Sequence, residues 1–128
     1  IKEYNLELLV NDDDTTVKEG WVNLIAPLGY LDFLKLMTEA KVVLTDSGGI
    51  QEETTILGIP CITMRNNTER PVTVSEGTNT IVGTEKNKIL EKASEVLNGY
   101  SPTGRRPELW DGRASERIVR VLLKFLKE

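Results

Sequence analysis

Apolar and polar positions along this chain follow two alternating patterns, and together they predict an α/β fold. Short runs of apolar and β-branched residues, typical of buried strands, lie at residues 21–26, 41–45, 59–64 and 79–83. Helices are predicted to start at Gly29 and to cover residues 49–57, 71–76, 84–97 and 113–127. Strands that alternate with helices are typical of a parallel sheet, so the pattern predicts a parallel sheet flanked by helices.

Glycine, proline and threonine mark the ends of several predicted helices. Gly58 follows helix 49–57 as a C-cap, and Pro60 prevents the helix from continuing. Pro71 suits the first turn of a short helix, where its missing N–H costs nothing. Thr84 offers a side-chain cap for the helix that follows it.

The final helix is strongly amphipathic. Its polar face carries charges of both signs, whereas a helix that lies on a membrane surface would carry a basic face. We therefore expect this helix to pack across the sheet. Its apolar face holds Ile118, Val121, Leu122, Phe125 and Leu126.

The first residues are less regular. Residues 1–9 fit both a helix and a strand, and the tail of a truncated helix is the favoured interpretation. Residues 11–16 predict a solvated, like-charged loop. With 128 residues, the chain from Ile1 onward predicts a single domain, 1–128, that is incomplete at its N-terminus.

Composition excludes several classes of function. The formal net charge of −4 argues against nucleic acid as a partner, because phosphate contacts need a basic face. The single cysteine, Cys61, lies in an apolar run and predicts a buried structural thiol in a chain without disulfides. There is no histidine, so neither a Ser-His-Asp triad nor a zinc site is expected. No apolar run reaches the length of a membrane span, and a soluble cytoplasmic protein is the prediction.

The turn after strand 41–45 carries the clearest chemical signal. Ser47, Gly48 and Gly49 link this strand to the next helix, whose free N–H groups and positive dipole end favour an anion such as phosphate. The glycines allow the backbone to approach a ligand closely. Glu53, about one turn further on, could accept hydrogen bonds from a vicinal diol such as a ribose. The combination suggests a nucleotide diphosphate site.

A plainer interpretation of the same residues remains open. A Ser-Gly-Gly turn often only closes a strand-helix loop, and an acidic residue early in a helix often only complements the dipole. The chain also lacks the glycine-rich fingerprints of P-loop and dinucleotide-binding proteins.

Several segments, in order along the chain, resemble the C-terminal half of the non-hydrolysing UDP-N-acetylglucosamine 2-epimerases. The match runs from about residue 21 to the C-terminus. The most specific segments are 45–53 (TDSGGIQEE), 57–60 (LGIP) and 64–71 (MRNNTERP). Further matches are 27–33 (PLGYLDF), 76–79 (EGTN) and 111–115 (DGRAS).

The resemblance implies a Rossmann-like parallel sheet within the C-terminal domain of a two-domain, GT-B-type fold. It also implies that the complete enzyme is an isomerase. Enzymes of this family interconvert UDP-N-acetylglucosamine and UDP-N-acetylmannosamine by eliminating UDP and adding it back on the other face of C2. They require no metal and no nicotinamide cofactor.

The same resemblance assigns the substrate-binding residues. It implies that Phe33 stacks on uracil, that Ser47, Gly48 and Gly49 hold phosphate, that Glu53 holds ribose, and that Arg70 binds the charged end of UDP. From the residues alone, Phe33 would more often be a core residue and Arg70 a surface charge. Arg65 receives no role.

No residue of this chain is assigned to catalysis. In the family, the acid and base are carboxylates of the N-terminal domain, assisted by a histidine between the domains, and this chain has no histidine. The expected partners are UDP, UDP-N-acetylhexosamine, the N-terminal domain of the same enzyme and a second copy in a homodimer. Cell-surface polysaccharide biosynthesis is the implied setting.

Two other functions stay open on the sequence. One is the nucleotide-binding domain of a GT-B glycosyltransferase, which also places a glycine-rich turn and a glutamate on its donor. The other is a nucleotide-sugar-binding module without catalysis.

Overall fold

The computed structural model describes residues 17–19 and 22–126, and the chain divides into two compact units, Ile1–Leu36 and Met37–Glu128. The predictions for residues 1–9 and 11–16, and Trp21 itself, lie outside the described residues. Each unit is described by itself.

The first unit contains a small antiparallel pair of strands. β1 (Val17–Glu19) pairs with β2 (Val22–Leu24), with Val17 opposite Leu24. β2 confirms a strand at the centre of residues 21–26, whereas β1 was not predicted from the sequence. The expectation that this strand belongs to the parallel sheet is wrong, because β2 pairs antiparallel with β1 in a separate two-stranded sheet. α1 (Tyr30–Thr38) follows, and the Phe33 N–H donates to the Gly29 carbonyl at 2.9 Å, so the predicted helix start at Gly29 is confirmed.

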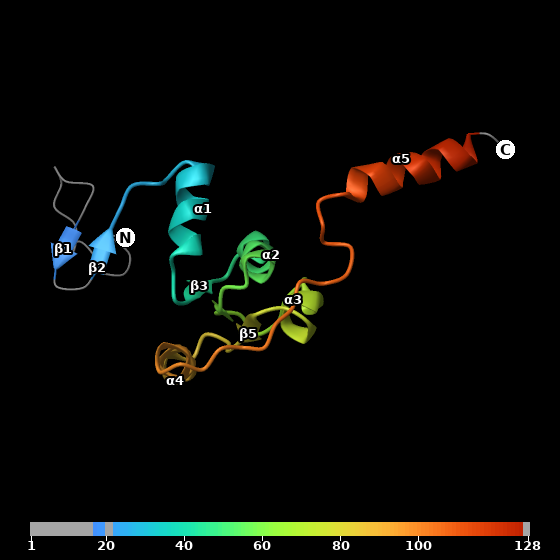
Figure 1. The fold of residues 1–128 in the computed structure, drawn as a ribbon. Coiled ribbons are helices and arrows are strands. Elements are labelled where there is room, and N and C mark those ends of the chain that lie inside the picture. The colour runs from blue at the N-terminus through green and yellow to red at the C-terminus, as the bar shows by residue number, and fades with distance from the viewer. Residues whose placement is uncertain (1–16, 20–21, 127–128) are drawn as a thin grey trace. The chain divides into compact units, whose positions relative to one another are not determined.

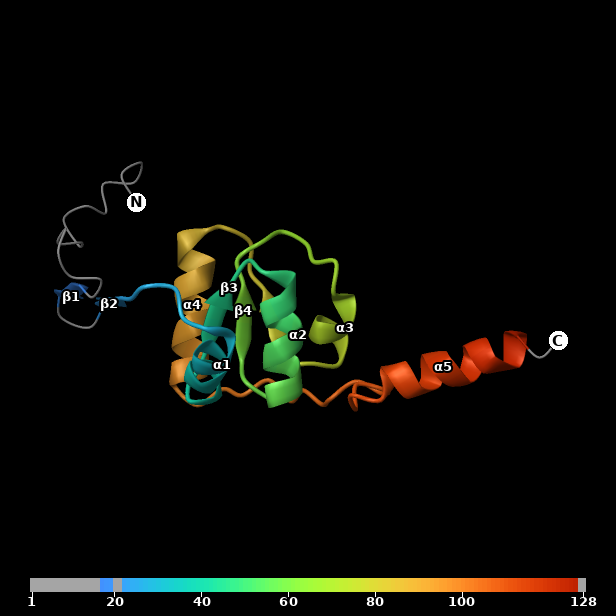
Figure 2. The same cartoon turned by 90° about the horizontal axis from the view of Figure 1, so that it is seen from above.

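The second unit is built on a three-stranded parallel sheet in the order β3-β4-β5. Its strands are β3 (Val43–Thr45), β4 (Cys61–Thr63) and β5 (Asn79–Ile81). α2 (Gly48–Leu57) connects the first two, and α3 (Pro71–Ser75) connects the last two. Figures 1 and 2 place α2 and α3 on one face of the sheet and α4 (Lys86–Leu97) on the other. The strands share one direction, so their carboxyl ends meet at one edge.

The glycine after α2 ends the helix as the sequence predicts. Gly58 takes a left-handed conformation with φ of 73°. Its N–H donates to the Thr55 carbonyl at 3.3 Å, and the Ile59 N–H donates to the Thr54 carbonyl at 2.9 Å. These two bonds form a Schellman motif, which satisfies carbonyls that the helix end would otherwise leave free.

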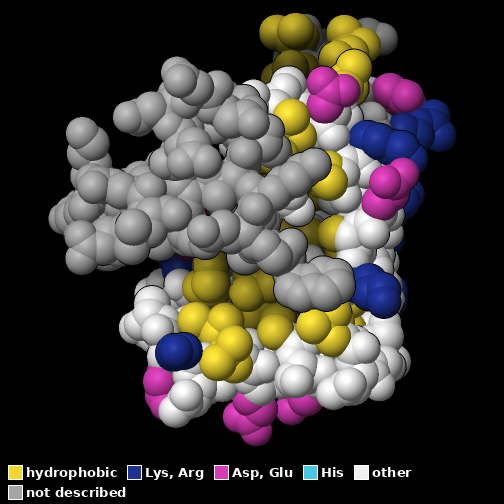
Figure 3. All heavy atoms as spheres, turned by 90° about the vertical axis from the view of Figure 1, so that its left-hand side faces the viewer, with side chains coloured by type: hydrophobic (Ala, Val, Ile, Leu, Met, Phe, Trp, Pro, Cys, Tyr) yellow, Lys and Arg dark blue, Asp and Glu magenta, His cyan; other side chains and the backbone are white. Residues whose placement is uncertain are grey.

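The interior of the second unit is unusually polar. The buried apolar side chains among the described residues are Met37, Ile59, Cys61 and Ile62. The buried polar side chains are Gln51, Thr54, Thr55, Thr63, Thr73, Thr78 and Asn79. Cys61 is 1% exposed, and burial raises the pKa of its thiol, which confirms the predicted structural cysteine. Many large apolar side chains stay at the surface, as the yellow patches of Figure 3 show.

Two predictions about the later helices are wrong. The N-cap of α4 is Glu85 and not Thr84, and no side chain caps this end.

α5 (Ala114–Phe125) does not pack across the sheet, because it buries none of its residues. Its apolar face is open, and Phe125 is 76% exposed. The start of α5 is instead held by Asp111, which accepts from the Arg113 N–H and pairs with Arg117. The Arg117 guanidinium, with the Arg113 N–H, lowers the pKa of Asp111 to about 2.

Gly58→Ala should destabilise the protein, because a side chain in the left-handed region costs about 1–2 kcal/mol. Gly58→Asn is the matched control, since asparagine tolerates this conformation better. Urea unfolding of the three proteins measures the difference. An alanine variant as stable as the wild type would show that Gly58 does not end the helix in this way.

Candidate functional site

The candidate site lies where β3 and β4 end side by side. Thr45 is the register partner of Thr63, and the Met64 N–H donates to the Thr45 carbonyl at 2.9 Å. The Ser47 turn and residues 64–70 therefore leave the same edge of the sheet. Ligands of open α/β sheets bind at this carboxyl edge.

The first turn of α2 has no side-chain cap. Ser47 is the N-cap residue, with φ of −83° and ψ of 129°, but its side chain makes no capping hydrogen bond. Its own N–H donates to Thr45 Oγ1 at 3.0 Å. The first turn also contains no acidic residue. The N–H groups and the positive dipole end of this helix are thus not neutralised from within the helix.

The two glycines of the turn differ in their surroundings. A Cβ on Gly48 would collide with the Glu69 carboxylate and lie 3.8 Å from Arg70 Cγ. Gly48 therefore lets residues 69 and 70 approach the helix start, whether or not a ligand binds. A Cβ on Gly49 would meet only Ser47 Oγ, at 3.9 Å. Packing among the described residues thus does not explain the glycine at position 49.

Arg70 reaches α2 through an ion pair. Its Nε lies 3.1 Å from Glu52 Oε1, and the two side chains are 44% and 36% exposed. Arg65, for which no role is predicted, lies at the same edge. Its Nη1 donates to Glu69 Oε2 at 3.2 Å and approaches the Asp46 carbonyl at 3.5 Å. Exposed ion pairs of this kind contribute about 0–1 kcal/mol to stability, so an anion that binds the guanidinium groups more strongly can displace the carboxylates.

Glu53 lies in α2 and is half-buried. Its Oε2 is shielded from solvent and has no hydrogen-bond partner among the described residues. A shielded carboxylate oxygen without a donor is unfavourable, and a ligand hydroxyl would satisfy it. This environment is compatible with the ribose role that the sequence predicts.

Phe33 is half-buried in α1 and belongs to the first unit, while the other candidates lie in the second. Its role at uracil stays a prediction. Within the second unit, the structure brings Arg70 against the Gly48 end of α2, and Glu53 lies further along the same helix.

Sequence reasoning missed the buried polar side chains behind this edge. Gln51 Oε1 accepts hydrogen bonds from Thr68 Oγ1 at 2.6 Å and from Asn79 Nδ2 at 3.0 Å. Thr63 Oγ1 donates to Asn79 Oδ1 at 2.6 Å. The signal was a cluster of threonine, asparagine and glutamine at core positions of predicted helices and strands, where apolar residues are the rule.

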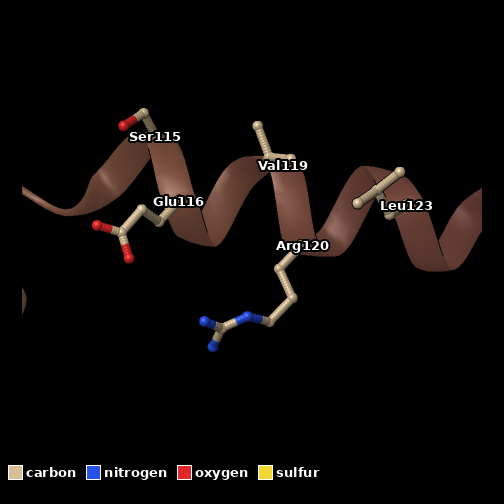
Figure 4. Close-up of a pocket in the computed structure, with 5 residues that line it drawn as sticks. All are labelled: Ser115, Glu116, Val119, Arg120 and Leu123. Carbon is tan, nitrogen blue, oxygen red and sulfur yellow. The ribbon is translucent and has the colours of Figure 1, made fainter.

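A surface hollow on α5 does not form a comparable site. The hollow in Figure 4 is lined by Ser115, Glu116, Val119, Arg120 and Leu123, which all come from α5, so it does not enclose a ligand. Among the described residues, no group of three or more acidic, cysteine or histidine side chains is placed to hold a metal ion. Over the same residues, no helix has the length and apolar character needed to cross a membrane.

The chain matches a known family over most of its length. The family model for UDP-N-acetylglucosamine 2-epimerase matches residues 8–123. The UDP-N-acetylglucosamine 2-epimerase of Methanocaldococcus jannaschii is 44% identical over 122 residues, which are 95% of this chain and 31% of that protein. The Escherichia coli K12 enzyme of the same name is 46% identical over 105 residues, 79% of this chain and 28% of that one.

Solved structures agree with these relatives. The M. jannaschii enzyme in complex with UDP-GlcNAc and UDP has a TM-score of 0.74 and 41% identity, over 96% of this chain and 32% of that chain. Staphylococcus aureus MnaA with UDP has a TM-score of 0.79 and 32% identity, over 98% and 33%. This chain thus spans about a third of the length of these proteins.

The sheet, its flanking helices and these likenesses define a Rossmann-like part of a GT-B-type fold. The chain belongs to the UDP-N-acetylglucosamine 2-epimerase family. The resemblance found in the sequence is thereby confirmed.

Gly49→Ala should affect the free energy of unfolding and the affinity for UDP in different ways. The added Cβ would meet only Ser47 Oγ, at 3.9 Å, which is an ordinary van der Waals contact. Alanine in place of a helical glycine should therefore keep or raise the free energy of unfolding, by up to about 1 kcal/mol. The sequence predicts that this turn holds a phosphate of UDP, and on that prediction UDP should bind the variant more weakly, because the Cβ would fill space that the phosphate needs. Unfolding and calorimetric titration measure both quantities. Unchanged UDP affinity would contradict a phosphate at this position.

Proposed function

We propose that this chain is the UDP-binding part of an isomerase that interconverts UDP-N-acetylglucosamine and UDP-N-acetylmannosamine. The reaction would proceed at C2 through elimination and re-addition of UDP. Membership of the epimerase family supports the reaction class. Solved relatives at 41% and 32% identity contain UDP, and one of them also contains UDP-GlcNAc.

The observation that supports UDP binding most directly is the start of α2. This helix begins at a turn without a side-chain cap, and the Arg70 side chain lies against the same turn. Backbone N–H groups, a helix dipole and a guanidinium together favour a diphosphate. We therefore assign phosphate binding to Ser47, Gly48, Gly49 and Arg70.

The remaining substrate contacts follow from the chemistry of the side chains. Glu53 is proposed to accept hydrogen bonds from the ribose hydroxyls, which would satisfy its shielded Oε2. Phe33 is proposed to stack on uracil, a role that suits a flat apolar ring. In this proposal, residues 1–128 act as one UDP-binding domain.

The chemical step needs groups that this proposal does not place in the chain. Proton removal at C2 and its return require a general base and a general acid. We propose that another part of the complete enzyme supplies them, and that no cofactor takes part. A homodimer, a cytoplasmic location and a role in cell-surface polysaccharide biosynthesis stay predictions from the sequence.

Glu53→Ala should weaken UDP binding more than dUDP binding. A hydrogen bond to a charged group contributes about 1.5–3 kcal/mol, and dUDP lacks the 2′-hydroxyl that would form one of these bonds. Calorimetric titration of wild type and variant with both nucleotides measures the difference.

The matched control is Glu91→Ala, which removes an exposed glutamate from α4 on the opposite face of the sheet. It should bind both nucleotides as the wild type does. If Glu53→Ala reduces UDP and dUDP affinity by the same factor, Glu53 does not bind the ribose 2′-hydroxyl.

A further inference from the structure

The backbone of Arg70 is held by a closed ring of hydrogen bonds. Its N–H donates to Thr68 Oγ1 at 2.9 Å, and Thr68 Oγ1 donates to Gln51 Oε1 at 2.6 Å. Its carbonyl accepts from Thr73 Oγ1 at 2.7 Å. Asn79 Nδ2 closes the ring by donating to both Thr73 Oγ1 and Gln51 Oε1, each at 3.0 Å.

The anchors of this ring are deeply buried. Gln51 and Thr73 are 0% exposed, and Asn79 is 4% exposed. A buried amide or hydroxyl that loses its partner is strongly disfavoured, so these hydrogen bonds favour this one arrangement of the ring. The Nε2 of Gln51, also buried, has no partner among the described residues. The loop that carries Arg70 is therefore fixed to α2, α3 and β5 before any ligand arrives.

The Arg70 side chain, in contrast, is held only weakly. It is 44% exposed and forms an exposed pair with Glu52. Because its backbone is fixed, the base of the side chain stays beside Gly48 at the start of α2 even when this pair opens, and the guanidinium remains within reach of this turn. A rigid backbone with an available charged group reduces the entropy lost on binding an anion.

We propose that Thr68 is a positioning residue for the diphosphate: its hydroxyl connects buried Gln51 to the Arg70 N–H and so places the Arg70 guanidinium at the phosphate site. Thr68 need not touch the nucleotide. This inference rests on the proposed function, since it takes UDP as the ligand of the site.

A purely structural role for Thr68 makes a different prediction. If the hydroxyl only stabilised the fold, its loss would weaken all ligands alike, or none. If it acts through Arg70, its loss weakens phosphate binding and has no further effect once Arg70 is removed.

The test compares Thr68→Val, which has the same shape without the hydroxyl, with Thr68→Ser, which keeps the hydroxyl. NMR titrations of the 128-residue chain with UDP and with uridine measure both affinities. We expect Thr68→Val to bind UDP about tenfold more weakly, the loss of roughly one well-placed hydrogen bond, and uridine as the wild type does. Thr68→Ser should restore UDP binding to within about twofold.

A double-mutant cycle with Arg70→Ala completes the test. Thr68→Val combined with Arg70→Ala should bind UDP no more weakly than Arg70→Ala alone, because the two residues act as one unit.

Thr103→Val, an exposed change in the loop after α4, is the control for loss of a threonine hydroxyl. Thr68→Cys, with a weaker hydrogen-bonding group, replaces the valine variant if that variant does not fold.

The outcomes separate this inference from the proposed function. A wild-type chain that does not bind UDP would overturn both. Wild-type binding of UDP with an unchanged Thr68→Val, an equal loss for UDP and uridine, or additive effects in the cycle would overturn the positioning role and leave UDP binding in place.

Discussion

The hydrogen bonds that Gln51 accepts from Thr68 and Asn79 hold the candidate site together. They join α2, the loop before α3 and β5, three segments far apart in the sequence. Loss of either bond would leave a further buried polar group unpaired, at a cost of about 1–3 kcal/mol. The buried Nε2 of Gln51 already lacks a partner among the described residues. An apolar core would hold the same elements with less directional preference. The polar interior thus explains how a short three-stranded sheet can hold this loop in one conformation.

Charge at the carboxyl edge is balanced within the chain. Arg70 pairs with Glu52, and Arg65 pairs with Glu69, whose carboxylate also lies against Gly48. These contacts are exposed and individually weak. A diphosphate carries more charge and more acceptor oxygens than one carboxylate, and it can exchange with them at small cost. The acidic net charge of −4 therefore does not conflict with anion binding at one local site.

Local patterns predicted the elements well, because strand runs, the Ser47 turn and the Gly58 cap are determined by neighbouring residues. Contacts between distant residues were not predictable in this way. A threonine such as Thr73 has the same local signal whether it faces solvent or a buried asparagine. The spacing of apolar residues predicted that α5 is an amphipathic helix, but it could not show where the apolar face packs. The expected packing on the sheet is wrong. The family resemblance supplied the roles of Phe33 and Arg70, which no local pattern contains.

A two-dimensional amide NMR titration of the chain with UDP tests most directly whether the diphosphate binds the backbone at the start of α2, beside the loop held by Gln51. We expect the largest shift changes for the amides of Gly48, Gly49 and Arg70, with small changes in α4. Saturable binding with changes confined to α4 or α5, and none at Gly48 and Gly49, would contradict this expectation.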